Sequence, residues 1–331
     1  MKIKVIFTGG SIGSRTEQNT VKLADTPPVS LLRGFESDDM QFETASPYSI
    51  MSEELSPAEL TKLARCIERE SAGFDGVVVT HGTDTLCYTS AFLSYLFADS
   101  LPIALVSSAS PLSGCHSNGR HNLAAALQYI KSGSSGVAVP WYYQGAAVIH
   151  HGARLFRQRP YDELIQSVGD EVLFYMGPGA LAGSWRENSG SGRLTSLLAK
   201  PDEEITSGFG RVMYLKALPG MYYPALSEGT AAVLIECYNS GTLCADSGFA
   251  DFMTRASELG IPVFISGTGG IAQLSETVGK YLELGAIPLP KATPDSMYIK
   301  LCLAVSAGGD IVTTMKENCA GELIPEADFM H

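Results

Sequence analysis

The chain has 331 residues, of which 45% are hydrophobic and 18% are charged, as in ordinary globular proteins. Its formal net charge is −12, and no run of Lys or Arg offsets this locally, which argues against nucleic acid or an anionic membrane surface as partner. No segment is long enough to span a membrane. Small ligands are therefore the expected partners, and the length favours two domains over one.

The first residues and the cysteines both indicate a cytoplasmic protein. Residues 1–7 alternate charged and apolar side chains and run into a glycine turn, which is typical of a strand and not of a signal peptide. The seven cysteines are odd in number, scattered and mostly inside apolar stretches. We therefore expect reduced, buried thiols and no structural disulfide.

In the first half of the chain, strand-like apolar runs alternate with helical patterns. The runs cover residues 3–7, 76–80, 103–106 and 137–139. This order predicts a mostly parallel sheet with helices on both faces. One helix start is clear, because Ser56 is a capping hydroxyl, Pro57 follows it and Glu59 comes three residues later. Leu60, Leu63 and Ile67 are then its expected buried stripe.

Between about residues 188 and 208 the composition changes to Ser, Gly, Lys, Pro and acidic residues. We therefore expect an N-terminal catalytic domain over residues 1–188, a linker over 189–209 and a smaller C-terminal α/β domain over 210–331. Strand-like runs resume at 212–215, 231–235 and 262–265. Helical patterns cover 246–259 and 294–305.

The first candidate site follows the first strand, where Thr8 is followed by Gly9, Gly10 and Ser11. Ligands of open parallel sheets bind at the carboxyl ends of strands, so Ser11 is placed where a nucleophile would be useful. A tight turn without chemistry is an equal alternative. Residues 9–13 also match the G-x-S-x-G motif of α/β-hydrolases, but that motif follows several earlier strands, and here one strand precedes Ser11.

The second candidate site follows the strand that ends at Thr80. Thr83 and Asp84 come at the start of the next helix, at the same sheet edge as Ser11. Taken alone, Asp84 or Thr85 is equally well explained as a helix cap. Two hydroxyl-bearing turns and a carboxylate at one edge favour a functional site.

These motifs resemble the two signatures of the L-asparaginase/glutaminase family, in the order in which that family carries them. The sequence T-G-G-S-I occupies residues 8–12, and H-G-T-D-T occupies residues 81–85. Two further segments look like those of the family, S-E-E-L-S-P at 52–57 and N-G-R-H-N-L at 118–123. K-A-L-P-G at 216–220 and Y-N-S-G-T at 238–242 look like C-terminal features of its cytoplasmic, type I-like members. The resemblance covers essentially the whole chain.

The resemblance implies a role for each matched residue. Ser11 takes the place of the acylated nucleophile, which is normally threonine, and Thr83 and Asp84 belong to a second catalytic constellation. Asp84 would also hold the substrate's α-ammonium group, with Glu53 as a second acceptor. Ser52 would donate to the α-carboxylate.

The same resemblance implies the reaction. The backbone amides of Gly82 and Thr83 would stabilise the oxyanion. The expected activity is hydrolysis of L-asparagine to L-aspartate and ammonia through an acyl-enzyme, with no cofactor and no metal. Family members complete their sites across subunits, so we expect a homodimer or homotetramer, with Glu276 as a candidate for reaching a neighbouring site.

Besides Ser11, the chain departs from the family pattern at the positions of its lysine and its loop tyrosine. Arg157 aligns with the family's catalytic lysine, although Arg159 could substitute for it. An arginine cannot act as a base, so Arg157 is expected to fix Asp84 and polarise Thr83. The family's loop tyrosine is absent, and Thr20 is the nearest aligned hydroxyl, which calls for a bridging water or a larger substrate.

Three other functions stay open. The substrate could be a related amide, such as glutamine or an asparaginyl peptide. The chain could be an ammonia-supplying subunit of a tRNA-dependent system, as in one branch of the family. It could also be an amino-acid-binding homologue with weakened catalysis. Residues 267–270 have the composition of a phosphate loop but lack its G-K-[ST] ending, so a plain turn is expected there.

Overall fold

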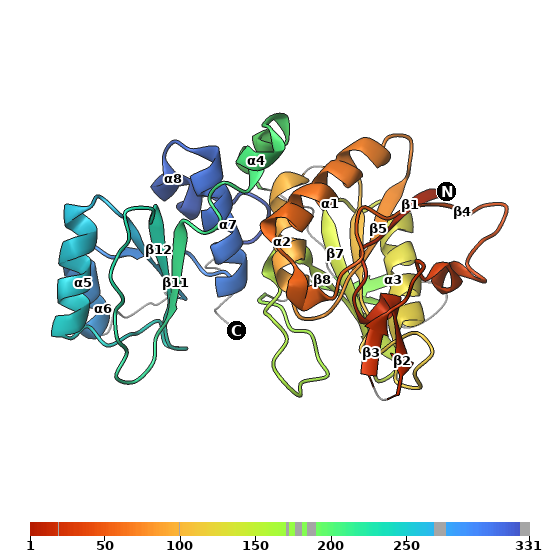
Figure 1. Ribbon diagram of the computed structural model, residues 1–331, viewed down its shortest axis with the longest axis horizontal. Coiled ribbons are helices and arrows are strands. Elements are labelled where there is room, and N and C mark those ends of the chain that lie inside the picture. Colours follow the sequence, from red (N-terminus) through yellow and green to blue (C-terminus); the bar gives the residue numbers. More distant parts are fainter. Residues whose placement is uncertain are drawn as a thin grey trace.

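The computed structural model describes residues 1–18, 20–98, 100–169, 172–175, 181–183, 190–267 and 276–324. Its two larger sheets flank a central helix (Figure 1). The first sheet has eight strands in the order β10-β9-β8-β7-β6-β5-β1-β4. Their bounds are β1 Lys2–Phe7, β4 Gln41–Ala45, β5 Gly76–Thr80, β6 Ile103–Val106, β7 Val137–Tyr143, β8 Ala146–His151, β9 Leu173–Tyr175 and β10 Leu181–Gly183.

The five strands from β4 to β7 run parallel, and β8, β9 and β10 add antiparallel pairs at the other side. In the register of β1 and β5, Phe7 lies opposite Thr80. The two motifs that follow these strands therefore leave the sheet side by side at its carboxyl edge.

Helices cover both faces of the first sheet because its strand side chains alternate between two apolar cores. Ile6, Val77 and Val79 pack with α1 (Pro57–Glu70) and α2 (Leu86–Leu96). Val5 and Val78 pack on the opposite face with α3 (Gly119–Lys131). The sheet is thus a middle layer with both faces covered, so a site can form at the ends of its strands.

Helix α1 begins as its sequence predicts. The Ser56 hydroxyl accepts a hydrogen bond from the amide of Ala58 and contacts the Glu59 carboxylate. The expected stripe of Leu60, Leu63 and Ile67 is buried. In helix α2, ten of the eleven residues are buried. It is an interior helix and not an amphipathic one.

The second sheet is parallel, with the order β11-β12-β13-β14. Helices α5 and α6 pack on one face, and α7 with Met315 of α8 packs on the other. The bounds are β11 Val212–Lys216, β12 Ala232–Glu236, β13 Val263–Ser266, β14 Ile287–Pro288, α5 Ser247–Glu258, α6 Glu276–Glu283, α7 Pro294–Ala307 and α8 Ile311–Lys316.

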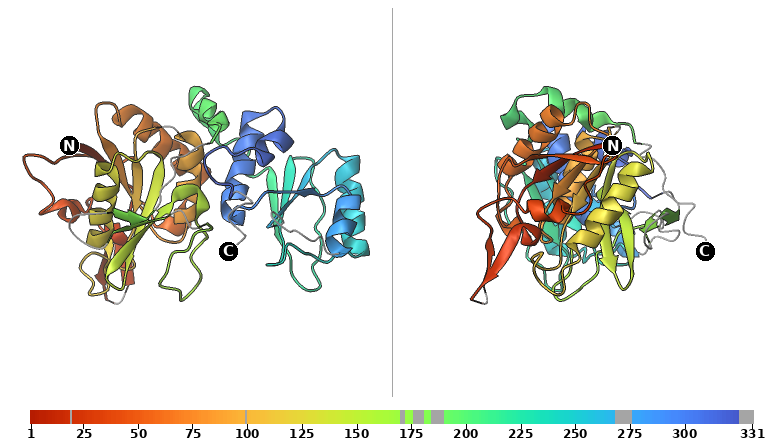
Figure 2. Two further views of the ribbon diagram at one scale, coloured as in Figure 1. Left: turned by 180° about the vertical axis from the view of Figure 1, so that it is seen from behind. Right: turned by 90° about the vertical axis from the view of Figure 1, so that its right-hand side faces the viewer.

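Helix α7 belongs to both cores, and Figure 2 shows it between the two sheets. Its Ile299 and Leu303 pack into the core of α1 and α2, whereas Met297 and Leu301 pack against the second sheet. The Tyr95 hydroxyl of α2 is 2.7 Å from the Ser296 hydroxyl. The helix therefore fixes the two halves of the molecule to each other.

The expected fold class is confirmed: a larger, mostly parallel sheet with helices on both faces and a smaller C-terminal α/β part. The strand expected at 137–139 continues to Tyr143. The hairpin β2 (Ser14–Glu17) and β3 (Thr20–Leu23), together with β4 and β8 to β10, were not expected. The domain boundaries at 188 and 209 stay a prediction. All seven cysteines are free, and no helix in the described ranges is long and apolar enough to cross a membrane.

Candidate active site

The two glycine motifs meet backbone against backbone. A methyl group placed on Gly10 would lie 2.3 Å from the amide nitrogen of Gly82, and Gly10 has a φ of 72°. The amide of Gly10 also donates to the Ile50 carbonyl, over 2.9 Å, which brings the chain before Ser52 into the same place. Only glycine fits this crossing, because it permits both the close approach and the positive φ.

This crossing joins the turns that contain Ser11 and Thr83. Each follows directly after one of the two touching glycines, and each is half-buried. Ser11 begins a short 3-10 turn (Ser11–Gly13), and among the described residues its hydroxyl has no hydrogen-bond partner. The structure therefore brings the backbone at Ser11 close to the turn that carries Thr83.

Ser52 and Asp84 form the polar side of the same crossing. A methyl group on Gly82 would lie 2.5 Å from the Ser52 hydroxyl oxygen, which is itself 3.4 Å from the Asp84 carboxylate. That separation is long for an O–H···O bond, so the contact between the two groups is weak. Asp84 is exposed, and Glu53 is exposed one residue after Ser52.

Thr85 has a role other than the helix cap considered from the sequence. It stands before α2, but its side chain makes no capping hydrogen bond. Its hydroxyl donates instead to the Ser52 carbonyl, over 2.9 Å. This bond ties the turn of Ser52 to the start of α2 and so holds Ser52 next to Asp84.

His81 fixes the peptide group between Gly82 and Thr83. Its Nδ1 lies 2.8 Å from the Gly82 carbonyl oxygen, and its Nε2 lies 2.9 Å from the Thr89 hydroxyl. Burial lowers the pKa of His81, so the ring is neutral. Because the carbonyl can only accept, Nδ1 carries the proton and Thr89 donates to Nε2. The ring therefore sets the direction of the Thr83 N–H.

The structure does not bring Arg157 to the residues that it was expected to orient. Its guanidinium lies 3.6 Å from the carboxylate of Glu236, at the end of β12, and its backbone amide donates to Asp295. Among the described residues it makes no hydrogen bond or ion pair with Thr83 or Asp84. Burial alone would lower the pKa of Arg157, but its acidic surroundings together raise it. The Arg157 guanidinium therefore pairs with a residue of the second sheet.

The remaining predicted residues lie outside the crossing. Thr20 is exposed at the tip of the β2–β3 hairpin, paired with Glu17, and the hairpin projects from the sheet in Figures 1 and 2. Glu276 is exposed on α6 and pairs with Lys280 at 2.7 Å. Residues 268–270 lie outside the described residues. The described parts of the chain contain no group of three or more His, Cys, Asp or Glu that could hold a metal ion.

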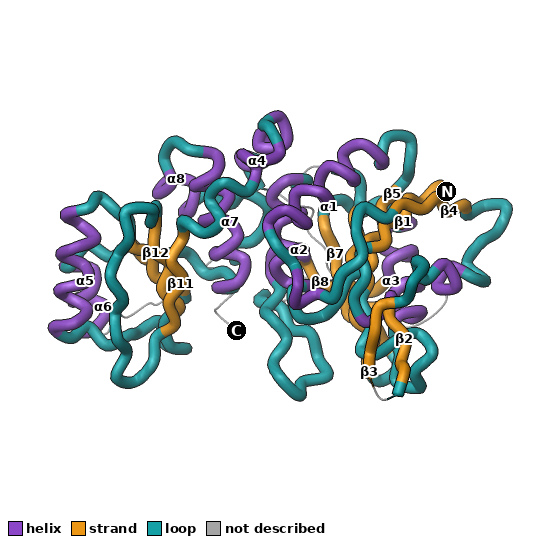
Figure 3. Tube along the Cα trace, in the orientation of Figure 1, coloured by secondary structure: helices purple, strands orange, loops and turns teal. Residues whose placement is uncertain are grey.

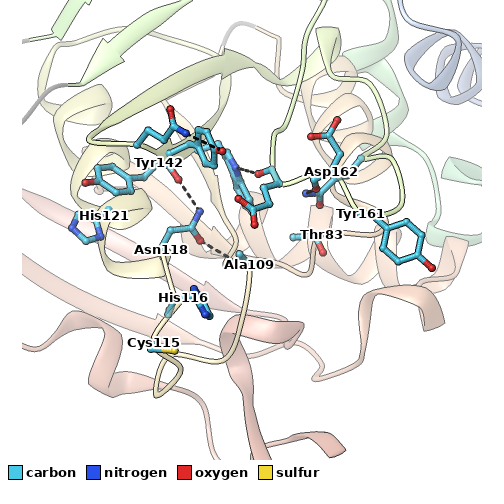
Figure 4. Close-up of a pocket in the computed structure, with 15 residues that line it drawn as sticks. Thr83, Ala109, Cys115, His116, Asn118, His121, Tyr142, Tyr161 and Asp162 are labelled. Atoms are coloured by element: carbon cyan, nitrogen blue, oxygen red, sulfur yellow. Dashed lines mark hydrogen bonds between the residues drawn. The ribbon is translucent and has the colours of Figure 1, made fainter.

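A cavity of about 710 Å³ begins at Thr83 and was missed by the sequence analysis (Figure 4). Residues of the loop after β6, of the end of β7 and of the segment 156–163 line it, and Figure 3 shows this last segment as a loop. The run Trp141, Tyr142 and Tyr143 contributes three of its rings. That aromatic run was the available signal, but the strand was expected to end before it.

Comparison with known proteins gives consistent results. Residues 2–161 match the family described as asparaginase, N-terminal. An L-asparaginase of Thermococcus kodakarensis is 27% identical over 98% of this chain and 99% of its own length. A glutamyl-tRNA(Gln) amidotransferase subunit of Aeropyrum pernix is 28% identical over 97% of this chain and 79% of its own. The structure of L-asparaginase I from Vibrio cholerae superposes with a TM-score of 0.72 at 20% identity, covering 98% of this chain and 99% of the other.

Proposed function

Since the chain is an amidohydrolase of the asparaginase family, we propose that it hydrolyses L-asparagine to L-aspartate and ammonia with Ser11 as nucleophile. The observation that supports the proposal is the contact between the backbones of Gly10 and Gly82, which directly precede Ser11 and Thr83 in the chain. A relative named L-asparaginase that matches over its full length supports the substrate.

The substrate's α-ammonium group is held by Asp84 and Glu53, and its α-carboxylate accepts a hydrogen bond from Ser52. This arrangement presents the side-chain carbonyl to Ser11. The N–H groups of Gly82 and Thr83 receive the oxyanion, and the neutral His81 ring keeps the second of these in place. One such donor is worth about 2.7 to 4 kcal/mol of barrier.

The reaction has two balanced steps. The Ser11 oxygen attacks the amide carbon, the C–N bond breaks, and the serine proton leaves with ammonia. Water then hydrolyses the ester, releasing aspartate and restoring the hydroxyl. Thr83 relays the proton, and Asp84 is the nearby basic group. Arginine does not give up its proton, so Arg157 does not serve as the base of either step. Its guanidinium pairs with Glu236 instead.

A panel of amides tests the proposal. Ammonia release by the purified protein is measured with L-asparagine, D-asparagine, L-glutamine and an asparaginyl peptide, and we expect L-asparagine to have the highest kcat/KM. A higher value for glutamine or the peptide would replace asparagine by that substrate. Calorimetric binding of L-aspartate without turnover of any amide would show a homologue that has lost catalysis.

Replacing Gly10 with alanine is expected to lower kcat by at least about tenfold. The new methyl group collides with Gly82 and forces the two hydroxyl-bearing turns apart. Gly13→Ala is the matched control, because the nearest atom to its added methyl, on Pro28, is 4.0 Å away. Circular dichroism checks that both variants fold, and equal kcat in the two would remove the crossing from the mechanism.

The relative named as part of a glutamyl-tRNA(Gln) amidotransferase motivates a second candidate, an ammonia-supplying subunit. Full activity of the isolated chain would exclude it. We place the enzyme in the cytoplasm, as its seven free cysteines suggest, and as a homodimer or homotetramer in which Glu276 faces a neighbouring site. Sedimentation equilibrium of the wild type and of Glu276→Gln, with their activities, tests that assembly.

A further inference from the structure

The cavity at Thr83 is much larger than asparagine hydrolysis requires. The leaving group of asparagine is ammonia, which is close in size to a water molecule, or roughly 30 Å³. The cavity holds about 710 Å³, within the range of sites for larger organic ligands. A primary amide would therefore leave nearly all of it unused.

The position of the cavity identifies which part of a substrate would enter it. Thr83 is the one residue of the candidate site among those that line it, and Ser11, Ser52 and Asp84 do not. In the proposed function Ser52 and Asp84 hold the amino-acid end of the substrate. The group attached to the amide nitrogen is then the part that extends past Thr83 into the cavity.

The walls provide flat apolar surfaces. Trp141, Tyr142 and Tyr143 lie in sequence at the end of β7, and the ring of His121 stacks on Tyr142 with centroids 4.1 Å apart. Tyr161 stands at the other side of the opening (Figure 4). Such rings accept another aromatic ring in offset-stacked or edge-to-face contact.

The charges of the walls are of one sign. Asp162 and Glu163 are the acidic residues among the described lining residues, which include neither Lys nor Arg. A carboxylate or phosphate on the substrate would meet like charge there and find no cation to pair with. A positively charged group would be attracted both to these carboxylates and to the aromatic faces.

The walls are held in place by their own hydrogen bonds. The Asn118 side chain accepts from the Ala109 amide at 2.9 Å and donates to the Tyr142 carbonyl at 3.0 Å. The Trp141 indole donates to the Glu163 carbonyl at 2.8 Å, which ties the 156–163 loop to β7. The cavity is thus formed before a ligand enters, which lowers the entropy lost on binding.

We propose that this cavity is a leaving-group subsite, and that the enzyme acts on L-aspartate β-amides whose nitrogen carries an aromatic, positively charged substituent. This rests on the proposed function and names its substrate class. Ser11 attacks the secondary amide, the C–N bond breaks, and the amine departs through the cavity with the serine proton. Water then releases aspartate as it does with asparagine.

The experiment compares L-aspartate β-amides of methylamine, benzylamine, 4-(aminomethyl)benzylamine and 4-carboxybenzylamine, with aspartate release as the readout. Methylamine and benzylamine are both alkylamine leaving groups, so a difference in kcat/KM between their amides reports on binding of the benzyl ring. We expect kcat/KM to be at least about tenfold higher for the benzylamide, because binding of the remote ring lowers the barrier. The kcat/KM of the aminomethyl compound should exceed that of the benzylamide, and the kcat/KM of the carboxy compound should fall below it.

Two variants and one control test whether the preference for the substituted amides arises in the cavity. Ala109 is exposed at the cavity wall, so Ala109→Phe should lower kcat/KM for the benzylamide by at least about tenfold while L-asparagine turnover stays unchanged. The control Ala72→Phe lies in the exposed turn before β5, at the opposite sheet edge, and should change neither. Asp162→Asn should remove the preference for the aminomethyl compound over the benzylamide.

The outcomes separate the two proposals. One outcome overturns the subsite and leaves the proposed function standing. In it L-asparagine is hydrolysed, the benzylamide has no higher kcat/KM than the methylamide, and Ala109→Phe changes the turnover of the benzylamide and of L-asparagine alike. If the benzylamide is hydrolysed with the expected response to Ala109→Phe and L-asparagine is not, the subsite stands and asparagine is not the substrate. If no amide is hydrolysed, the proposed function fails and the subsite with it.

Discussion

Replacing Ser11 with alanine is expected to lower kcat for L-asparagine by about 10³-fold or more, because the acyl-enzyme cannot form without the hydroxyl. The variant should fold normally. Ser11 is half-buried, and its hydroxyl has no hydrogen-bond partner among the described residues, so its loss leaves no unpaired group. Ammonia release and thermal unfolding, measured on the same preparation, separate catalysis from stability.

Two further variants complete this test. Ser11→Thr restores the residue that the family normally has and should keep turnover within about tenfold of the wild type, since the hydroxyl is retained. Ser257→Ala removes an exposed hydroxyl from α5, far along the chain, and should have no effect. Comparable turnover by Ser11→Ala and the wild type would remove Ser11 from the mechanism.

Replacing Glu322 with glutamine is expected to destabilise the protein by about 3 to 5 kcal/mol. Glu322 and Lys300 form an ion pair of 2.5 Å with both side chains fully buried. The lysine also donates to the carbonyls of Met315 and Glu317, and the carboxylate accepts from the amide of Ala320. Glutamine keeps the shape but leaves the buried ammonium without its counter-charge. The measurement is urea unfolding followed by fluorescence and circular dichroism.

A surface pair supplies the comparison. Glu276 and Lys280 are 2.7 Å apart on α6 but largely exposed, so Glu276→Gln should leave the stability nearly unchanged. The double variant Lys300→Met with Glu322→Gln should lose less stability than the sum of its single changes, because the isolated buried charge is gone. Additive losses, or a loss for Glu322→Gln as small as the surface pair's, would contradict this role of the buried pair.

The parts of the fold that could be predicted are those that local sequence determines. Strands β5 and β6 lie at the residues expected of them, because each is a short apolar run bounded by polar turns and buried on both faces. Helix α1 starts at Pro57, as its capping residues indicate. The carboxyl-edge rule predicts that the turns after β1 and β5 lie at one sheet edge, and Gly10 and Gly82 of these turns are in contact.

The rest depended on partners distant in the chain. Strand β4 (Gln41–Ala45) is largely polar and exposed, so only its pairing with β1 makes it a strand. Arg157 was assigned from its alignment, but its direction is set by Glu236, which comes from the second sheet. The cavity likewise needs three segments that have no common sequence pattern.

The sharing of α7 between the two cores has a consequence for biosynthesis. This helix is made from residues 294–307, yet its Ile299 and Leu303 complete the apolar interior beneath the first sheet. While the ribosome is still synthesising the second half, the hydrophobic surface that α7 will cover stays open to solvent. The nascent N-terminal half therefore exposes apolar surface, which favours aggregation, until residues 294–307 have been synthesised and have folded onto it.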